Sequence, residues 1–407
     1  MSQPAQPDDD VDPWHRNSAS GLFATIWDKR AAMGITRVAD LTGLDVIGMP
    51  VYAAYRPNSR GLAVSQGKGL SHAQARLAAV MEAVEGYHGE HIERPLRLAS
   101  YAELAGSLPL LDPASLPRLG HGAYRPNWRM LWIEGREVVT GAAIWLPFEC
   151  VHSDACQPQP AGAGCFPVST NGLGAGADGT AARWTALLEV IERDALSLWQ
   201  YRPRHARARR RINLRTVRHA GLRQLIDTLA QAGFAVALDD MSSDLPVACV
   251  QAVIAPKAPE RRGISPQPGL GQAAHPDPER ACLKALCEAV QVRTTYIAGA
   301  RDDLEPGAFS QAGLQDSQRR ALQLIETVSS DRSIDALPRA NVTDAADLAA
   351  ALNGLGLGPT IAVDLAKPAL GIAVERVIVP GLEAPHDTAG YCPRQRALAL
   401  AAAGEDA

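Results

Sequence analysis

The sequence predicts a mixed α/β (α+β) fold, and three observations support that prediction. Long helices are expected over about residues 71–91, 180–201 and 278–298, where apolar residues recur at helical spacing. Runs rich in β-branched residues lie between these helices, and over residues 21–66 turn signals separate short apolar runs. No linker composition divides the chain. We therefore expect mixed sheets with the three helices packed on them.

The elements are expected in the following order. Residues 1–20 hold four Asp and one Arg and are predicted to form a flexible acidic tail. A strand is predicted over residues 51–55, within a region of strands and loops. The third helix begins after Asp277, with Pro278 at its first position, which is a good helix start. The remaining predicted strands cover residues 138–145, 235–238, 248–255 and 373–379.

The composition is that of a globular protein and excludes several function classes. The 407 residues are 46% hydrophobic and 21% charged, which excludes disordered, collagen-like and coiled-coil chains. The net charge is −4, so electrostatic binding of nucleic acid or of an anionic membrane is not expected. No apolar run reaches the roughly 18–20 residues of a membrane helix, and the first residues are unlike a signal peptide. The sequence predicts a soluble, cytoplasmic protein.

The seven cysteines form no CxxC pair and no zinc-ligand spacing. Without a secretion signal, reduced and mostly buried thiols are expected. Cys282 and Cys287 lie five residues apart on the third helix and point to different faces. We therefore expect core thiols at these two positions.

An alanine–acid pattern repeats in the three helices. Each set has the spacing 4, 3, 3, which places its members on one helix face. The small alanines permit close approach of a neighbouring backbone, and the acids beyond them project from one end of each helix. The three sets are Ala75, Ala79, Glu82 and Glu85; Ala182, Ala186, Glu189 and Glu192; and Ala281, Ala285, Glu288 and Gln291.

The four glutamates of the first two helices suggest a cation site. Their flanking positions are apolar, so the carboxylates are expected to be semi-buried, and together they would repel unless a cation lay among them. Hard oxygen ligands favour Mg²⁺. The pairs Gly67/Gly69 and Gly174/Gly176 precede these helices at equal distance, and Gly-rich turns at helix N-termini suggest a nucleotide phosphate. A solvated helix face remains the alternative for each Glu pair.

Four segments, in order, resemble the YcaO family: residues 65–91, 169–195, 271–303 and 374–383. The resemblance spans about residues 20–385. It implies an ATP-binding fold and enzymes that phosphorylate a peptide-bond oxygen when a nucleophile attacks that carbonyl. A Cys, Ser or Thr nucleophile gives an azoline, and external sulfide gives a thioamide, usually with a TfuA partner. The implied organisation is a tail at 1–20, a YcaO domain at 21–385 and a C-terminal extension at 386–407.

The resemblance also implies roles for residues at the motif positions. It assigns four carboxylates to Mg²⁺, two arginines to the phosphates of ATP, and a polar pair on the third helix to catalysis and cofactor binding. Lys68 is expected to reach a phosphate, with a solvated lysine as the alternative. The residues are Glu82, Glu85, Glu189 and Glu192 for Mg²⁺; Arg193 and Arg376 for phosphate and catalysis; and Glu288 and Gln291 for the third helix, where Arg293 follows as a further cofactor contact.

Two positions depart from the family pattern. Ala177 stands where family members usually have Asn, and Ala181 where they carry a Glu. Both missing groups normally help to hold Mg²⁺ and phosphate, and Asp178 is the candidate replacement. A catalytically degenerate scaffold that presents a precursor peptide is therefore one alternative function.

Two features favour thioamide over azoline formation. The form Glu85-Gly86-Tyr87-His88 replaces the commoner Glu-Arg and looks like TfuA-associated members. The last residues, RQRALALAAAGEDA, lack the Pro-x-Pro-x-Pro tail of many azoline-forming relatives. The expected function is ATP- and Mg²⁺-dependent activation of a backbone amide in a ribosomally made peptide or protein, for thioamide formation. A TfuA-like or leader-recognition partner and a homo-oligomer are expected, and azoline-forming cyclodehydration is the enzyme alternative.

Two further patterns have simple interpretations. Glu85, His88 and His91 make a poor chelate at this spacing, so packing or surface roles are expected for the histidines. Residues 202–218 hold eight arginines and no acid. They are expected to form a solvated face or a docking surface for an acidic peptide or partner protein. Nucleic acid is disfavoured because aromatic residues are not interleaved with the arginines.

Overall fold

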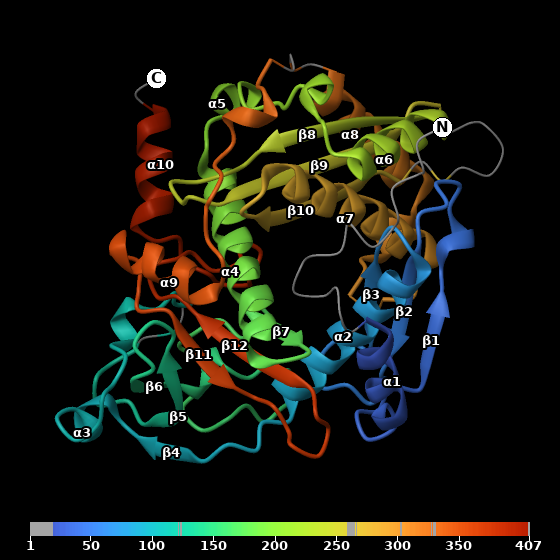
Figure 1. Ribbon diagram of the computed structural model, residues 1–407. Coiled ribbons are helices and arrows are strands. Elements are labelled where there is room, and N and C mark those ends of the chain that lie inside the picture. The colour runs from blue at the N-terminus through green and yellow to red at the C-terminus, as the bar shows by residue number, and fades with distance from the viewer. Residues whose placement is uncertain are drawn as a thin grey trace. The chain divides into compact units, whose positions relative to one another are not determined.

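The computed structural model describes residues 19–120, 122, 124–258, 265, 267–301, 303–326, 328 and 331–405. The chain divides into two compact units, which we describe separately (Figure 1). The first unit comprises Met1–Asn58, Leu62–Ala83 and Arg204–Ala340, and the second comprises Ser59–Gly61, Val84–Pro203 and Asn341–Ala407. Residues 1–18 of the predicted tail lie outside the described residues. Its last two residues, Ala19 and Ser20, begin helix α1.

The first unit contains two three-stranded antiparallel sheets, β1-β2-β3 and β10-β9-β8. Helix α7 packs on β9 and β10, and Figure 1 shows it lying along that sheet. Its elements are α1 (Ala19–Lys29), β1 (Arg37–Asp40), β2 (Val51–Tyr55), β3 (Val64–Lys68), α5 (Arg204–Ala208), α6 (Ala220–Gln231), β8 (Phe234–Asp240), β9 (Ala248–Pro256), β10 (Gly269–His275), α7 (Pro278–Ala298) and α8 (Gln311–Glu326), with short 3₁₀ turns between them.

The second unit contains a six-stranded antiparallel sheet of order β4-β5-β11-β12-β7, with β6 paired to β5. Helix α4 packs on β7 and β12. The elements are β4 (Leu96–Ala99), α3 (Tyr101–Leu104), β5 (Met130–Glu137), β6 (Ala143–Pro147), β7 (Leu173–Gly176), α4 (Gly179–Tyr201), α9 (Ala345–Gly354), β11 (Ile361–Asp364), β12 (Ala373–Ile378) and α10 (Gln395–Glu405). Helix α2 (His72–Glu90) runs from the first unit into the second.

The three predicted long helices are confirmed as α2, α4 and α7. Asp178 and Asp277 cap the N-termini of α4 and α7 with side-chain hydrogen bonds, and Gly299 ends α7 in the left-handed conformation. The single strand predicted over residues 138–145 is wrong. Residues 138–142 form the turn between β5 and β6, because Gly141 adopts a φ of 71° and its N–H donates to Glu137 O.

The repeated alanines pack against glycines of the preceding strand in all three helices. A Cβ on these glycines would overlap helix backbone atoms, so only glycine permits the approach. The predicted close approach at the alanines is confirmed. Of the two predicted glycine pairs, Gly67, Gly174 and Gly176 lie within β3 and β7, whereas Gly69 lies between β3 and α2. An added Cβ would lie 2.0 Å from Ala79 N at Gly67, 2.3 Å from Ala182 O at Gly174, and 2.3 Å from Ala285 O at Gly271.

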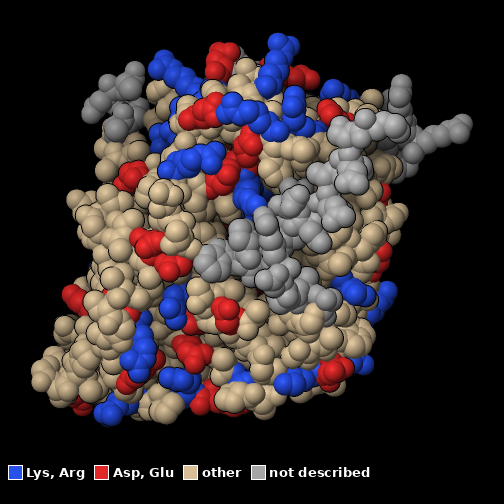
Figure 2. Space-filling view, in the orientation of Figure 1, with Lys and Arg blue, Asp and Glu red and all other residues tan. Residues whose placement is uncertain are grey.

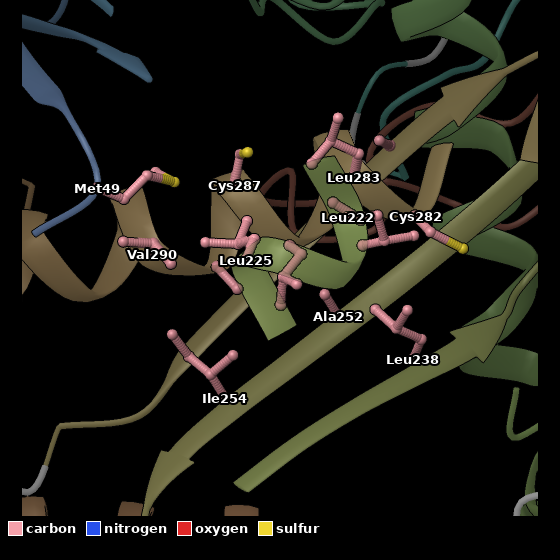
Figure 3. Packing of buried hydrophobic residues seen from close by; sticks show 14 of the residues in the cluster. Met49, Leu222, Leu225, Leu238, Ala252, Ile254, Cys282, Leu283, Cys287 and Val290 are labelled. Atoms are coloured by element: carbon pink, nitrogen blue, oxygen red, sulfur yellow. The ribbon is translucent and has the colours of Figure 1, made fainter. Parts of the chain in front are cut away.

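The core of the first unit gathers where α6 and α7 pack on the sheet β10-β9-β8. Figure 3 shows Leu222 and Leu225 of α6 beside Cys282 and Cys287 of α7, above Ile254 of β9. Both cysteines are buried thiols rather than halves of a disulfide, which confirms the prediction of core cysteines. This packing fixes α7, which carries the third alanine–acid set. Among the described residues, no helix is both long enough and apolar enough to cross a membrane.

Candidate functional site

The residues implied by the family motifs divide between the two units. The first unit holds Lys68, Glu82, Glu288, Gln291 and Arg293, and the second holds Glu85, Glu189, Glu192, Arg193 and Arg376.

Glu82 is held by the main chain of β3. The Gln66 N–H donates to Glu82 Oε2 at 2.8 Å. Desolvation raises the pKa of the Glu82 carboxyl, and this N–H together with the charges of Lys68 and Arg301 acts against that shift. The side chain nonetheless remains exposed, so its desolvation is incomplete. A carboxylate with hydrogen-bonded anchoring and access to water is suited to bind a cation.

Lys68 is paired across the first unit rather than simply solvated. Its Nζ lies 2.9 Å from Glu288 Oε2, and the two side chains are 27% and 20% exposed. Such a partly exposed pair adds little stability, about 0–1 kcal/mol. The ion pair instead fixes the position of the Lys68 side chain, because it joins the end of β3 to α7.

A buried amide next to this pair was not predicted from the sequence. Thr295 Oγ1 donates to Gln66 Oε1 and, at 2.8 Å, to Gln291 O. Gln66 Nε2 and Gln291 Oε1 are buried and have no hydrogen-bond partner among the described residues. An unused donor and an unused acceptor therefore lie on two residues that both contact Thr295 Oγ1, Gln66 through its side-chain oxygen and Gln291 through its main-chain oxygen. The only sequence signal for Gln66 is its place directly before Gly67.

Arg293 does not fit the predicted contact with the nucleotide. Its Nε and Nη2 donate to the Asp45 carboxylate at 2.9 and 3.0 Å, and its Nη1 donates to the Ser265 and Gln267 carbonyls. The side chain is fully buried, and its guanidinium lies 4.7 Å from the centre of the Phe234 ring. The expectation is wrong because every nitrogen of Arg293 already has a protein acceptor.

In the second unit, Glu85 repeats the arrangement of Glu82. The Ala175 N–H of β7 donates to Glu85 Oε1 at 2.8 Å. On α4, Arg193 Nε lies 3.9 Å from Glu189 Oε1 and 3.8 Å from Glu192 Oε1. The two α4 carboxylates are 27% and 14% exposed, as expected for semi-buried glutamates.

Arg376 of β12 is buried, and burial lowers its pKa to about 10. Its Nη1 donates to Ser169 O at 2.7 Å, whereas its Nε has no partner among the described residues. Glu189 lies close enough to act in the opposite direction on this pKa. Arg376 also lines a cavity of about 70 Å³.

Asp178 is committed to the start of α4. Its Oδ1 accepts the Ala181 N–H at 2.9 Å, which is the N-cap bond of the helix. Ala177 is exposed and Ala181 is buried. The carboxylate that was expected to replace the missing Asn and Glu thus has a structural role in capping α4.

His88 of α2 and His91, directly after that helix, have packing roles, as expected. His88 is fully buried and its Nδ1 lies 2.8 Å from Val84 O, while His91 Nδ1 lies 3.0 Å from Tyr87 O. The His91 ring stacks on Tyr87.

The arginine-rich segment is partly structural. Arg210 and Arg211 pair with Asp240 and Asp239, and both also donate to main-chain carbonyls. The exposed arginines that remain include Arg204, Arg209 and Arg215. Figure 2 shows basic and acidic side chains interspersed over the region where α5 and α8 lie in Figure 1. In this view the arginines therefore have acidic side chains among them.

Each unit offers donors whose chemistry suits Mg²⁺ or a nucleotide. Both contain carboxylates with hard oxygens; the second adds the cation of Arg193, and the first adds the cation of Lys68 and the buried Gln291 Oε1, which has no partner among the described residues. Among the described residues, no group of three or more His, Cys, Asp or Glu is arranged to hold a metal alone. Mg²⁺ commonly keeps waters and phosphate oxygens as ligands, so an all-protein cage is not required.

Comparisons with known proteins agree with this chemistry. A family model described as "YcaO cyclodehydratase, ATP- and Mg²⁺-binding" matches residues 66–383. A protein of Rhizobium leguminosarum bv. trifolii, described as uncharacterized and in the tfuA 3′ region, is 33% identical over 89% of this chain and 86% of its own length. A protein of Methanothermobacter thermautotrophicus is 32% identical over 88% of this chain and 91% of its own.

Solved structures show the same fold. YcaO from Methanopyrus kandleri, bound with AMPPCP and Mg²⁺, matches with a TM-score of 0.68 and 26% identity, over 92% of this chain and 94% of that one. A heterocyclase in complex with substrate and cofactor matches with a TM-score of 0.70 and 19% identity, over 92% of this chain and 56% of that one. The cofactors are accordingly ATP and Mg²⁺. With most of its length matched by the family model, the chain belongs to the YcaO family of ATP-dependent backbone-modifying enzymes.

Proposed function

We propose that this enzyme exchanges sulfur for oxygen in a backbone amide of a ribosomally made peptide or protein, together with a TfuA-like partner. The observation that carries the proposal is the 33% identical relative described as lying in the tfuA 3′ region. The Glu85-Gly86-Tyr87-His88 form of the first motif supports it.

The proposed reaction converts an amide, hydrosulfide and ATP into a thioamide, ADP and inorganic phosphate. The carbon–oxygen bond of the amide breaks, its oxygen leaves on the phosphate, and a carbon–sulfur double bond forms. The proton of hydrosulfide ends on the phosphate. Bound Mg-ATP supplies the phosphoryl group that makes the amide oxygen a good leaving group.

We assign a role in binding magnesium or phosphate to residues of each unit. Glu82 in the first unit and Glu85, Glu189 and Glu192 in the second are the proposed magnesium ligands. The strand N–H groups that hold Glu82 and Glu85 favour the charged carboxylates and fix their orientation. Arg193, beside two of the carboxylates, is proposed to stabilise negative charge on the phosphoryl oxygens.

The proposed roles in the first unit are binding and orientation. Lys68, held by Glu288, is proposed to contact a phosphate, and Glu288 thereby positions that lysine. The buried Gln291 Oε1 is proposed to accept a hydrogen bond from the nucleotide, which would satisfy an atom that lacks a protein donor among the described residues.

Azoline formation is the second candidate, because the matching family model is described as a cyclodehydratase. The two reactions leave different masses on the product. Sulfur-for-oxygen exchange makes a peptide heavier, whereas cyclodehydration removes one water for each ring.

The test compares peptide masses from three strains that produce the TfuA-like partner, with the natural chain, with Glu189→Gln and with a control variant. This substitution keeps the size of the side chain and removes its charge. We expect peptides with one oxygen replaced by sulfur from the natural chain and none from the variant. Glu326→Gln, at an exposed position of α8, is the matched control and should retain the products. Peptides that have lost water would instead favour azoline formation, and unmodified peptides throughout would contradict both reactions.

A further inference from the structure

Thr294 and Thr295 are adjacent buried threonines of α7, but their hydroxyls have different partners. Both donate to the main-chain oxygen four residues earlier, as threonines in helices often do. The distances are 2.9 Å to Val290 O and 2.8 Å to Gln291 O. The Thr295 hydroxyl has a second acceptor, the side-chain Oε1 of Gln66 in β3. Among the described residues, Thr295 alone of the two therefore links α7 to β3.

The buried amide of Gln66 depends on this hydroxyl. Gln66 is 4% exposed, and its Nε2 has no partner among the described residues. Without the Thr295 hydroxyl, both ends of the amide would be buried without a partner from those residues. Burial of an unpaired amide is costly, so the side chain would turn away from α7 towards another partner or water. The hydroxyl therefore holds the Gln66 side chain in place.

The main chain of the same residue holds Glu82. The Gln66 N–H donates to Glu82 Oε2 at 2.8 Å. β3 is an edge strand, paired with β2 along one side. Among the described residues, no second strand fixes this N–H, so its position follows that of Gln66 as a whole. A shift of Gln66 would consequently move the donor that orients the Glu82 carboxylate.

Helix α7 holds β3 at two side chains of one face. Side chains alternate along a strand, so Gln66 and Lys68 share a face, and they bond to Thr295 and Glu288 of α7. The Lys68–Glu288 pair is partly exposed, and water competes with it. Gln66 and Thr295 are both buried, so water does not compete with their hydrogen bond. The buried contact is therefore the one that fixes Gln66 against the helix.

We propose that Thr295, acting through Gln66, is a positioning residue for the magnesium ligand Glu82. The inference rests on the proposed function, in which Glu82 binds Mg²⁺, and deepens it by naming the residues that hold this ligand in place. The hydroxyl fixes the amide, the amide fixes the strand residue, and the N–H of that residue fixes the carboxylate. Mg²⁺ requires nearly ideal octahedral geometry, so a displaced carboxylate binds it less tightly.

The first test is a calorimetric titration of the purified full chain with ATP at a series of Mg²⁺ concentrations. Thr295→Val keeps the shape of the side chain and removes the hydroxyl. It should raise the Mg²⁺ concentration for half-maximal ATP binding by about three- to tenfold, as the loss of one hydrogen bond does. Thr294→Val is the matched control, because it removes a bond within the helix and should behave as the natural chain. Thr295→Ser keeps a hydroxyl and should restore the natural Mg²⁺ requirement.

Gln66→Met tests the other side of the same hydrogen bond. It removes the side-chain amide, keeps the main-chain N–H and leaves Gln291 unchanged. We expect the same rise in the Mg²⁺ requirement as in Thr295→Val. The double variant should show no further rise, because the two substitutions remove one bond. Circular dichroism confirms that each variant is folded before its titration is interpreted.

Amide hydrogen exchange without ATP and Mg²⁺ tests the link to the main chain. The Gln66 N–H should exchange faster in Thr295→Val than in Thr294→Val, because its contact with Glu82 is loosened. Equal exchange in the two variants would overturn the proposal. Equal Mg²⁺ requirements of these variants, or additive effects of Thr295→Val and Gln66→Met, would overturn it as well.

Peptide masses separate this inference from the proposed function. Thioamide products together with a Mg²⁺ requirement that Thr295→Val leaves unchanged would remove the positioning role alone. A Mg²⁺ requirement that depends on the Thr295 hydroxyl, without thioamide products, would support the positioning role and remove the proposed reaction. No Mg²⁺-dependent ATP binding by the natural chain would overturn both.

Discussion

Glu82 and Glu85 lie three residues apart on α2, and a strand N–H donates to each carboxylate. Gln66 of β3 supplies one donor and Ala175 of β7 the other. A main-chain donor favours the charged form of a carboxylate and fixes its orientation without a second side chain. The identity of the residue that supplies such an N–H is nearly free, which is why sequence motifs show the glutamates but not their anchors.

The contacts of a single side chain could not be predicted where its partner lies far away in the sequence. Arg293 follows a family motif, but its partner Asp45 lies 248 residues away in the sequence. Gln66 meets Thr295 across 229 residues. Nothing local to Arg293 indicates that it is buried. Nothing local to Gln66 indicates that its amide nitrogen is buried without a partner among the described residues. Motif position therefore predicted a nucleotide contact for Arg293, whose guanidinium instead pairs with Asp45.

His152 should make the protein less stable in acid. It is 2% exposed, neither ring nitrogen has a partner among the described residues, and burial lowers its pKa from 6.5 to about 4. The unfolded chain therefore takes up a proton before the folded one does. The contribution of His152 to the free energy of unfolding is fully present above about pH 6.5. It is lost as the pH falls toward the pKa of the folded state, near 4, and the total loss is up to about 3 kcal/mol.

The measurement is the midpoint of urea unfolding at several pH values for the natural chain and for His152→Phe, which keeps an aromatic ring against Phe148. The variant should lose less stability between pH 6.5 and 4. His91→Phe, at a partly exposed histidine, is the control and should follow the natural chain. Equal acid sensitivity of His152→Phe and the natural chain would contradict the predicted protonation.

At the scale of elements, each alanine–acid helix packs on a glycine-containing strand. The sequence pattern predicted the helices because alanine and acid spacing is local. It did not predict β10, whose sequence GLGQAAH has no β-branched residue. That strand forms because pairing with β9 and packing against α7 outweigh its low intrinsic propensity.

Replacing Gly67 by alanine should separate β3 from α2. The added Cβ would lie 2.0 Å from Ala79 N and 2.2 Å from Ala75 O, and neither backbone atom can move alone. We expect a loss of roughly 2 kcal/mol or more in the free energy of unfolding, as for an overpacked core. Gly43→Ala is the matched control in the same unit, because its Cβ would meet nothing within 4 Å. Urea unfolding measures both variants, and equal stability of the two would refute the packing role of Gly67.

At the scale of the whole chain, the two units are not consecutive in sequence. The chain crosses from one to the other within α2, after Pro203 and after Ala340, as well as around residues 59–61. Linker composition cannot reveal such a division, since no crossing requires a flexible Pro- or Gly-rich segment. The family resemblance was recognised from the order of its motifs along the chain, and the family match spans residues 66–383.

Whether the chain binds ATP despite Ala177 and Ala181 is also a property of the whole molecule. By the family resemblance these residues replace groups that help to bind Mg²⁺ and phosphate, and Asp178, which lies between them in the sequence, caps α4. The proposed function requires that the remaining carboxylates and Arg193 bind Mg-ATP without these two groups. A scaffold without nucleotide affinity is the opposite outcome.

The most direct test is a calorimetric titration of the purified chain with ATP, with and without Mg²⁺. We predict Mg²⁺-dependent binding of ATP, which the Glu189→Gln variant should lose and the Glu326→Gln variant should retain. No binding at millimolar ATP, repeated with the TfuA-like partner present, or binding that Glu189→Gln leaves unchanged, would contradict it.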